Sequence, residues 1–494
     1  MILLMFLVIA LLAFVGLIIS RNHRQMNTIC MVHSLVFALI SVWLILSGKI
    51  PITSLAFGSP YFFIDHLGIY EVLICTVIFT CAAVYARGYV DGLLESGELE
   101  KGSLRVFYLA LTSLLLVMVL TFFAENLAIF WICAELTTII SALLVAILST
   151  RENISAAIKY IFIASTSMLF SFVGITLLFE ISRSVTGTGT LSWTALLLQA
   201  HSFPTGMMTA VFVLVFIGFA AKSGIFPFHT WLPEAHAKSP SAVSAILSGV
   251  LLNVGIYGII RIYAIVHQTP SLGTASSLLV LFGMLTIGIA AFSMIPEKNL
   301  KKLIAFSSVE NMGILLIGLA VATPVAIFWV LFHIMAHSFT KASLFFSAGI
   351  LHRQYRNPLS NEVDDDICNV FRYQPLAAWG IIIGGIAITG MPPFPIFWSK
   401  LFILLQVGTV SPLALFAMLF LIFIAAVAFG YFVLTTFTKS SEPDKATDII
   451  RFPTPIGMKL PIILLLLLIF ITGVAFTTGE VSFITAIQNE LMFS

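Results

Sequence analysis

Apolar runs of about 20 residues recur along almost the whole chain, and this recurrence restricts the possible folds more than any other feature. An α-helix rises about 1.5 Å per residue, so a run of this length crosses the roughly 30 Å hydrocarbon core of a bilayer. Because lipid satisfies no backbone hydrogen bonds, we expect each run to be helical. The runs lie near residues 2–20, 28–47, 66–87, 104–123, 125–149, 154–180, 206–226, 241–264, 273–295, 303–321, 324–350, 374–390, 394–408, 411–437 and 458–478. We therefore predict an all-α membrane protein with about 14 transmembrane helices, in which 374–408 counts as one helix or two.

The composition excludes several other classes of protein. Of the 494 residues, 60% are hydrophobic and 9% are charged, whereas soluble domains carry about 25% charged residues. A formal net charge of +2 provides no basic surface for nucleic acid. The cysteines are isolated from one another, so we expect neither a zinc nor an iron–sulfur site. The polar connections are too short for a soluble domain that holds nucleotide, haem or flavin, and we expect no cofactor and no catalytic residue in this chain.

The polar connections suggest an orientation in the membrane. Residues 2–20 lack the basic start and cleavage site of a signal peptide, so we interpret them as the first helix. The basic stretch 21–25 follows, and the positive-inside rule places it in the cytoplasm and the N-terminus outside. Residues 48–64 then form an extracytoplasmic loop or hairpin, and 182–204 a turn with a short amphipathic piece. The longer charged connections are 352–374 and 439–452.

Lys222 follows an apolar run and directly precedes residues that interrupt a helix. Gly224 and Pro227 come within five residues of it, and His229 follows in the same Trp- and Pro-rich segment. Non-helical backbone at membrane depth occurs only where it is buried in protein or lines a watery cavity, and broken helices mark ion sites in transporters. Because a charge inside the membrane is costly, we predict a functional Lys222; the alternative is an anchor at the membrane interface.

Lys400 repeats this pattern in the second half of the chain. It follows the sequence GMPPFP (390–395), which interrupts an apolar segment, and another apolar run comes after it. Paired interrupted helices in the two halves of a transporter point to its sites. The alternative is a lysine that extends its ammonium group to the membrane surface.

Further ionisable groups lie within apolar runs. Glu135 has no other charge nearby, and a carboxylate at that depth must be paired or protonated. His333, His337 and Lys341 follow one another at intervals of four residues, along one side of a helix. Imidazole exchanges protons near neutral pH, so this row suits a proton relay. Metal binding lacks a third ligand here, and hydrogen bonds between helices remain a structural alternative.

Ser248 and Asn253 lie in the helix that follows the Lys222 break, where they either hydrogen-bond water or pack against neighbouring helices. Together, the groups form a series of carboxylate, ammonium and imidazole through apolar protein. In a low dielectric, moving one proton in such a series shifts the proton affinity of its neighbours. The residues alone therefore predict a translocator of protons or cations.

Four segments carry a resemblance to a known family. They read AKSGIFPFHTWLPEAHAKSPSAVSAILSGVLLNVGIYGIIR (221–261), KKLIAFSSVENMGIL (301–315), LFHIMAHSFTKASLFF (331–346) and GMPPFPIFWSKL (390–401). The chain resembles the antiporter-like subunits of complex I, Mrp antiporters and membrane-bound group 4 nickel–iron hydrogenases, and SSVENMG and LLSGVLLN are most similar to the F component of hydrogenase-4. The resemblance implies two inverted five-helix repeats, helices 4–8 and 9–13, in which helices 7 and 12 are broken.

The resemblance also implies roles for individual residues. A central polar axis in this family matches Glu135, Lys222, His333, His337 and Lys400. Asn253 departs from the pattern, because several members carry a lysine there. Since an asparagine holds no charge, we expect the relay at this point to use water, or Lys341 and the histidines.

The implied function is an integral subunit, in the cell's inner membrane, that moves protons or Na⁺. Its partners would be other membrane subunits of a hydrogenase-4 or formate hydrogenlyase-type complex, which carry out the redox chemistry. Alternatives are a subunit of a complex I-like quinone oxidoreductase, a subunit of a Mrp-type antiporter, or a scaffold with an inactive channel. The corresponding division of the chain is 1–103, 104–265 and 266–437, followed by the last loop and helix in 438–494.

Overall fold

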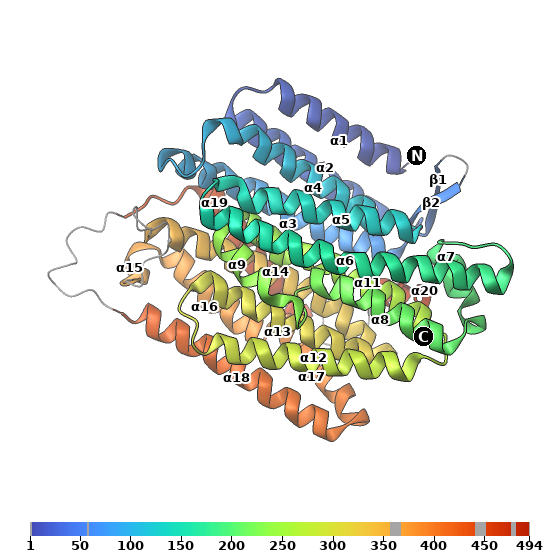
Figure 1. Ribbon diagram of the computed structural model, residues 1–494. Coiled ribbons are helices and arrows are strands. Elements are labelled where there is room, and N and C mark those ends of the chain that lie inside the picture. The colour runs from blue at the N-terminus through green and yellow to red at the C-terminus, as the bar shows by residue number, and fades with distance from the viewer. Residues whose placement is uncertain (1, 57–58, 356–366, 440–450, 476–480, 494) are drawn as a thin grey trace.

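The computed structural model describes residues 2–56, 59–355, 367–439, 451–475 and 481–493, and within these ranges it is a bundle of long helices (Figure 1). Thirteen helices in the described part are long and apolar enough to cross a membrane. Two shorter apolar helices, α16 (Pro375–Thr389) and α17 (Pro395–Val410), lie among them. The all-α, multi-pass membrane fold predicted from the apolar runs is therefore confirmed.

The long helices coincide with the predicted runs. They are α1 (Ile2–Ile19), α2 (His23–Ser47), α3 (His66–Glu95), α4 (Leu104–Phe122), α5 (Leu127–Val145), α6 (Arg151–Thr186), α8 (Thr205–Lys222), α10 and α11 (Ser241–Ile246 and Leu252–His267, joined by the π-helical turn Leu247–Leu251), α12 (Leu272–Met294), α13 (Leu300–Val321), α14 (Pro324–Gln354), α18 (Pro412–Phe437) and α19 (Ile456–Ala475). The short helices are α7 (Trp193–Gln199), α9 (Trp231–Lys238), α15 (Val370–Tyr373) and α20 (Ser482–Glu490).

Burial separates a central group of helices from a peripheral one. The most apolar window of the span Ser241–His267 is 100% buried, and those of α13 and α14 are each 89% buried. The same measure is 17% for α18 and 28% for α1. A helix that is apolar all round and also buried lies in the centre of a large bundle, whereas α18 presents Leu413, Phe416 and Phe423 outward, toward lipid. Polar side chains of the central helices are therefore shielded from lipid.

Both predicted helix interruptions are present. The first helix, α8, ends at Lys222, and Gly224 adopts a φ of 68° before a 3₁₀ turn (Phe228–Thr230) leads into α9. The second, α16, ends at Thr389, and Gly390 adopts a φ of 86° before α17 begins. Glycine tolerates this left-handed conformation, which ends a helix. Residues 374–408 consequently form two helices rather than one.

One end of the bundle carries the small elements. Strands β1 (Ile52–Ala56) and β2 (Ser59–Ile64) pair in an antiparallel hairpin, as expected for residues 48–64. The hairpin, α7 and α20 lie at the same end as the N-terminus (Figure 1). The basic residues 21–25 join α1 to α2 at the opposite end.

The sequence analysis missed α20, because a helix of this length is too short to span a membrane. Its Glu490 accepts hydrogen bonds from the backbone N–H of His66 (3.0 Å) and from the His66 ring Nδ1 (2.6 Å), at the start of α3. Of the two longer charged connections, residues 356–366 and 440–450 lie outside the described residues. The inverted repeats and the four-part division of the chain stay predictions.

Candidate functional site

Most polar residues predicted from the sequence lie inside the bundle. The side chains of Lys222, Ser248, Asn253, His333, His337 and Lys341 have no exposed surface, Lys400 is 4% exposed and His229 is 9% exposed. Glu135 is partly buried. Because these side chains are buried, each of them needs a hydrogen-bond or ion-pair partner or a change of charge.

Lys222 is held by the helix that carries Glu135. Its Nζ donates to the carbonyl oxygen of Ala134 and to the hydroxyl of Thr138, each at 2.8 Å. The Glu135 carboxylate accepts from the hydroxyl of Ser165 on α6, and its other oxygen has no partner among the described residues. Glu135 acts electrostatically on Lys222, yet no direct ion pair joins them in the part of the chain that the structure describes. The two charges therefore interact without being locked together.

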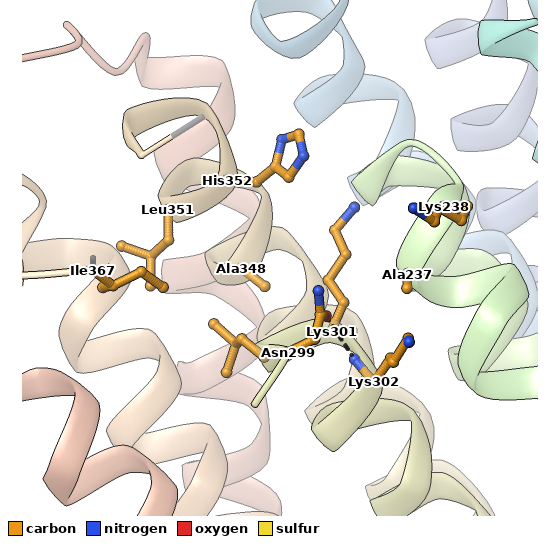
Figure 2. A pocket seen from close by; sticks show the side chains of 10 residues that line it. Ala237, Lys238, Asn299, Lys301, Lys302, Ala348, Leu351, His352 and Ile367 are labelled. Atoms are coloured by element: carbon orange, nitrogen blue, oxygen red, sulfur yellow. Dashed lines mark hydrogen bonds between the residues drawn. The ribbon is translucent and has the colours of Figure 1, made fainter. Parts of the chain in front are cut away.

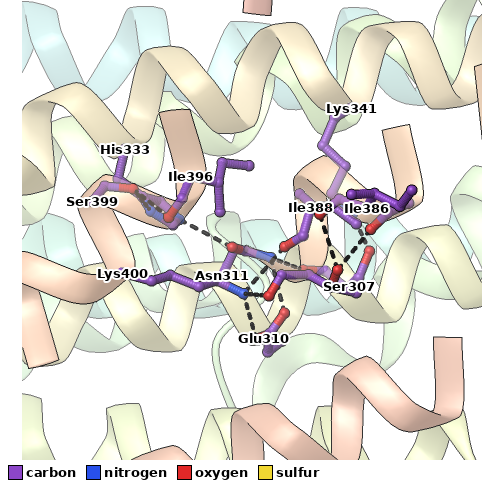
Figure 3. Close-up of polar contacts among 12 residues, drawn as sticks. Ser307, Glu310, Asn311, His333, Lys341, Ile386, Ile388, Ile396, Ser399 and Lys400 are labelled. Carbon is purple, nitrogen blue, oxygen red and sulfur yellow. Dashed lines mark hydrogen bonds and ion pairs between the residues drawn. The ribbon is translucent and has the colours of Figure 1, made fainter. Parts of the chain in front are cut away.

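Lys400, by contrast, forms a direct ion pair that the sequence analysis missed. Its Nζ donates to Glu310 Oε1 at 2.9 Å, and the exposed fractions of the two side chains are 5% and 3% (Figure 3). The ammonium also donates to the carbonyl oxygens of Ile388 (3.1 Å) and Thr389 (3.4 Å) at the end of α16. The C-terminal carbonyls of a helix attract a cation, so the end of α16 helps to balance the charge of Lys400.

Hydrogen bonds extend this pair to the histidine helix (Figure 3). Asn311 donates from Nδ2 to Glu310 Oε2 at 3.0 Å, and its Oδ1 lies 3.0 Å from His333 Nε2. The other ring nitrogen of His333 lies 2.8 Å from the hydroxyl of Ser399, one residue before Lys400. The result is a closed polar cluster contributed by α13, α14 and α17, which we call the Glu310–Lys400 cluster. It comprises Glu310, Asn311, His333, Ser399 and Lys400.

Lys341 lies farther along the same side of α14 and contacts α13. It donates to the carbonyl oxygen of Ile304 at 2.5 Å and to the hydroxyl of Ser307. Ser307 and Asn311 are one helical turn apart, so α13 brings Lys341 next to the Glu310–Lys400 cluster. His337 lies between, with its ring centroid 6.5 Å from that of His333, and neither of its nitrogens has a partner among the described residues.

His236 continues the histidine row into the first broken helix. It is buried on α9, stacks on Phe345 with 5.1 Å between ring centroids, and acts electrostatically on His337. Of the remaining predicted residues, Ser248 in the π-helical turn lies 2.7 Å from the hydroxyl of Ser308 on α13. His229 lies in the 3₁₀ turn, where its Nδ1 has no partner among the described residues.

Asn253 contacts a second carboxylate that the sequence analysis did not select. Its Nδ2 donates to Glu71 Oε2 on α3 and to the hydroxyl of Ser338 on α14, each at 3.1 Å. The rule that selected Glu135, a charge within an apolar run, applies equally to Glu71 and to Glu310. Lys159 of α6 pairs with Glu234 of α9 at 2.8 Å.

A basic pocket opens at the end of the bundle opposite the hairpin (Figure 2). Lys238, Lys301, Lys302 and His352 are among the residues that line it. Lys301 is 5% exposed and donates to the carbonyl oxygen of Ser239 at 3.0 Å. It lies about one turn before Ile304 on α13, which accepts from Lys341. One face of α13 thus leads from this pocket to Lys341 and on to the Glu310–Lys400 cluster.

Comparisons with known proteins show which family this chain belongs to. Residues 124–426, more than half of the chain, match the model of the family described as NADH:quinone oxidoreductase/Mrp antiporter, transmembrane. The chain is 32% identical over 358 residues to a hydrogenase-4 component F homolog of Methylacidiphilum infernorum (isolate V4), which covers 72% of this chain and 74% of that protein. It is 28% identical over 386 residues to hydrogenase-4 component B of Escherichia coli (strain K12), which covers 72% of this chain and 54% of that protein.

A solved structure shares the fold over nearly the full length. A chain of the membrane-bound sulfane sulfur reductase, an archaeal respiratory membrane complex, aligns with a TM-score of 0.86 at 22% identity, covering 99% of this chain and 96% of that one. The family match and the sequence relative confirm the resemblance that the four motifs carry. The chain is therefore an antiporter-like membrane subunit and belongs to the NADH:quinone oxidoreductase/Mrp antiporter transmembrane family.

Proposed function

We propose that this chain moves protons through its buried polar residues while other subunits of a membrane-bound hydrogenase or formate hydrogenlyase-type complex carry out redox chemistry. The Glu310–Lys400 cluster is the observation that carries the proposal. Its ionisable groups are buried, linked by hydrogen bonds, and lie next to Lys341 and His337. The relative named as a hydrogenase-4 component F homolog supports the choice of complex.

The type of side chain favours protons over Na⁺ as the transported ion. A sodium ion requires several oxygen ligands, whereas an ammonium group has only donors and repels a cation. Lys222, Lys341 and Lys400 lie along the proposed path, and each can bind and release a proton at its Nζ. Lysine also changes its proton affinity readily when it is buried, which suits a group that must bind and release protons in turn.

In the second half of the chain, charge balance determines when a proton leaves. Burial by itself would favour release from Lys400, but the carboxylate of Glu310 at 2.9 Å stabilises the ammonium form. A proton that reaches Glu310, directly or from His333, removes this stabilisation. Lys400 then gives up its own proton, because the ammonium is left in a low-dielectric site without a counter-charge. The ion pair therefore makes release from Lys400 depend on the arrival of another proton.

In the first half of the chain, Lys222 and Glu135 interact at longer range. Lys222 therefore donates to the neutral groups of Ala134 and Thr138. These hydrogen bonds, rather than an ion pair, stabilise its ammonium group. Lys222 is therefore the group whose charge a change elsewhere in the protein most easily alters. We infer that redox-driven changes in neighbouring subunits act first on this half.

The proposed location is the cell's inner membrane, with the N-terminus outside. The basic residues 21–25 and the basic pocket around Lys301 lie at the same end of the bundle, opposite the hairpin. With this end in the cytoplasm, the pocket would take up protons from the cytoplasm and α13 would pass them inward. A cysteine introduced at residue 22, in the α1–α2 turn, should react with an impermeant thiol reagent only in inverted vesicles.

The decisive experiment is to purify the tagged chain with the subunits that accompany it and to reconstitute the complex in proteoliposomes. We expect nickel–iron hydrogenase subunits in the preparation, and a pH gradient that forms during redox turnover and collapses with a protonophore. The gradient should be unchanged when Na⁺ is replaced by K⁺. Quinone oxidoreductase subunits in the preparation, or transport that requires Na⁺, would favour the complex I-like or the Mrp-type alternative instead.

A further inference from the structure

Glu71 is a buried carboxylate outside the series of residues described above. It lies on α3 and is 1% exposed. Its Oε2 accepts from the Asn253 side chain on α11, and the same amide nitrogen donates to the Ser338 hydroxyl on α14, each at 3.1 Å. Ser338 immediately follows His337 in the sequence. Glu71 therefore lies at a seam between α3, α11 and α14.

No cation balances the charge of Glu71 among the described residues. Glu71 acts electrostatically on Tyr70 and Cys75 of α3 and on Tyr257 of α11, and all three side chains are neutral at physiological pH. The nearby Arg261 is paired with Asp65 at 2.5 Å and donates to the hydroxyl of Tyr257. Arg261 and Asp65 therefore balance each other. Among the described residues, Glu71 has one hydrogen-bond donor, the neutral side-chain amide of Asn253.

Two acceptor atoms at this site lack a hydrogen-bond donor among the described residues. Among the residues that the structure describes, Glu71 Oε1 and Asn253 Oδ1 are both buried without a hydrogen-bond partner, although the two side chains are hydrogen-bonded to each other. A buried carboxylate with one neutral partner is costly, whereas a protonated carboxyl is neutral and supplies an O–H donor. One added proton therefore removes the uncompensated charge and provides a donor where an acceptor is unmatched.

A proton suits this site better than a metal cation does. The Asn253 amide turns its N–H₂ group, rather than its oxygen, toward both Glu71 and Ser338, because a carboxylate oxygen only accepts. A sodium ion at this site would need the side-chain oxygens of Glu71, Asn253 and Ser338 as ligands. It would instead contact the amide hydrogens of Asn253. We propose that Glu71 is a further proton-carrying group of this chain, which binds and releases one proton at the seam between α3, α11 and α14.

This proposal deepens the proposed function, since it adds a titrating group to the same proton path. Release breaks the O–H bond and leaves Glu71 as a carboxylate, and the proton forms a new bond to the next acceptor of the path. A merely structural Glu71 would need only its hydrogen bond to Asn253. Glutamine preserves that bond and the side-chain volume but holds no proton, so the two roles predict different results for Glu71→Gln.

The test uses the whole complex in proteoliposomes. Glu71→Gln should assemble and turn over but lose redox-driven proton transport, while Glu71→Asp should retain transport with a shifted pH profile. Glu125→Gln is the matched control, because Glu125 is buried yet binds Ser192 and Thr194 away from the path, and it should transport normally. Infrared spectra should contain the C=O stretching band of a protonated carboxyl group that Glu71→Gln removes and Glu125→Gln retains.

Normal transport by Glu71→Gln, or an infrared spectrum that it leaves unchanged, would overturn the proposal. A variant that alters only the Na⁺ dependence of transport would overturn it in favour of a cation site. If Glu71→Gln fails to assemble, Glu71→Asp decides, because a carbonyl band that does not move in this variant excludes Glu71 as its source. Lys222→Met measured in parallel separates the two proposals: loss of transport in that variant alone leaves the proposed function standing and removes only the role of Glu71.

Discussion

Lys222 and Lys400 are both buried lysines beside a helix break, yet their charges are balanced in different ways. Lys400 pairs directly with Glu310 and receives further support from the carbonyl oxygens at the end of α16. Lys222 binds a carbonyl and a hydroxyl group, while Glu135 acts on it from a greater distance. Because the strength of an electrostatic interaction falls with distance, the two pairs should differ in a measurable way.

We predict that Glu310 and Lys400 are strongly coupled and that Glu135 and Lys222 are weakly coupled. Lys400→Met leaves a buried carboxylate unpaired and should destabilise the protein by about 3 to 5 kcal/mol, whereas Lys400→Met combined with Glu310→Gln should recover most of this loss. The matching Lys222→Met and Glu135→Gln cycle should give a smaller interaction energy. Thermal unfolding of the purified chain in detergent measures both cycles, and equal coupling energies would contradict this reading of the contacts.

At the scale of the helices, the two breaks determine the positions of Lys222 and Lys400. Gly390 has a φ of 86°, and a Cβ at this position would lie 2.9 Å from Cδ of Lys400. Gly224 has a φ of 68°, and a Cβ there would lie 2.4 Å from Cδ1 of Leu232. Each glycine therefore combines a left-handed backbone with a close neighbour, and a Cβ at Gly390 would press on the lysine of its own break.

We predict that Gly390→Ala destabilises the chain by about 1 to 3 kcal/mol, the range for a non-glycine residue in this conformation. It should also slow transport, since the added methyl group displaces the Lys400 side chain. Gly206→Ala is the control: Gly206 has no neighbouring atom within 4 Å and no positive φ. Thermal unfolding and proteoliposome transport measure the two effects, and an equally mild result for both variants would show that the break at Gly390 is not constrained.

The short helix α20 is attached to the bundle by a contact that depends on pH. Burial and the nearby Asp65 raise the pKa of Glu490 above its usual range, against the opposing effect of His66. A carboxyl group whose pKa is raised by folding stabilises the folded state below its ordinary pKa and loses this contribution as the pH rises through the raised value. We predict that α20 is protected best at mildly acidic pH and opens as the pH increases.

Hydrogen exchange of the amides in α20, followed across this pH range, measures the effect after correction for the intrinsic rate. Glu490→Gln should remove the pH dependence and keep the hydrogen bond from the backbone of His66. Glu490→Gln that preserved the wild-type pH dependence would place the titrating group elsewhere.

At the scale of the whole molecule, the path that we propose uses polar residues of both halves of the chain. The basic pocket, Lys341 and the Glu310–Lys400 cluster lie along α13, and His236 joins the histidine row to the first broken helix. A proton can cross such a path only if every transfer step takes place. A change in one half should therefore stop transport through both.

We predict that Lys222→Met abolishes proton transport while the complex still assembles. Methionine has a similar length and suits an apolar site, so the loss of a titrating group is the main effect. Assembly is checked by the subunits that co-purify, and transport by the pH gradient in proteoliposomes. Lys49→Met, a change at an exposed lysine away from the pocket and the buried path, should leave transport close to that of the unaltered complex. Full transport by Lys222→Met would rule out the proposed path.

The helices, their breaks and several of the buried charges could be predicted from the sequence, because each is a local property. The length of an apolar run shows whether it can span a membrane, and glycine and proline interrupt a helix whatever its tertiary surroundings. The lysines 222 and 400, the histidines 333 and 337 and Glu135 were found in this way, since a charge inside an apolar run is visible without any tertiary information.

The partners of those charges were decided only by the tertiary structure. Glu310 and Lys400 are 90 residues apart in the sequence, and Glu71 and Asn253 are 182 residues apart. Which helices become neighbours depends on how the whole bundle packs, and a single sequence contains no local signal for that. The sequence therefore determined that this chain crosses the membrane many times with ionisable groups inside it. Only the packing of α3, α11, α13, α14 and α17 decided which of those groups balance one another, because electrostatic balance depends on distances between atoms and not on positions along the chain.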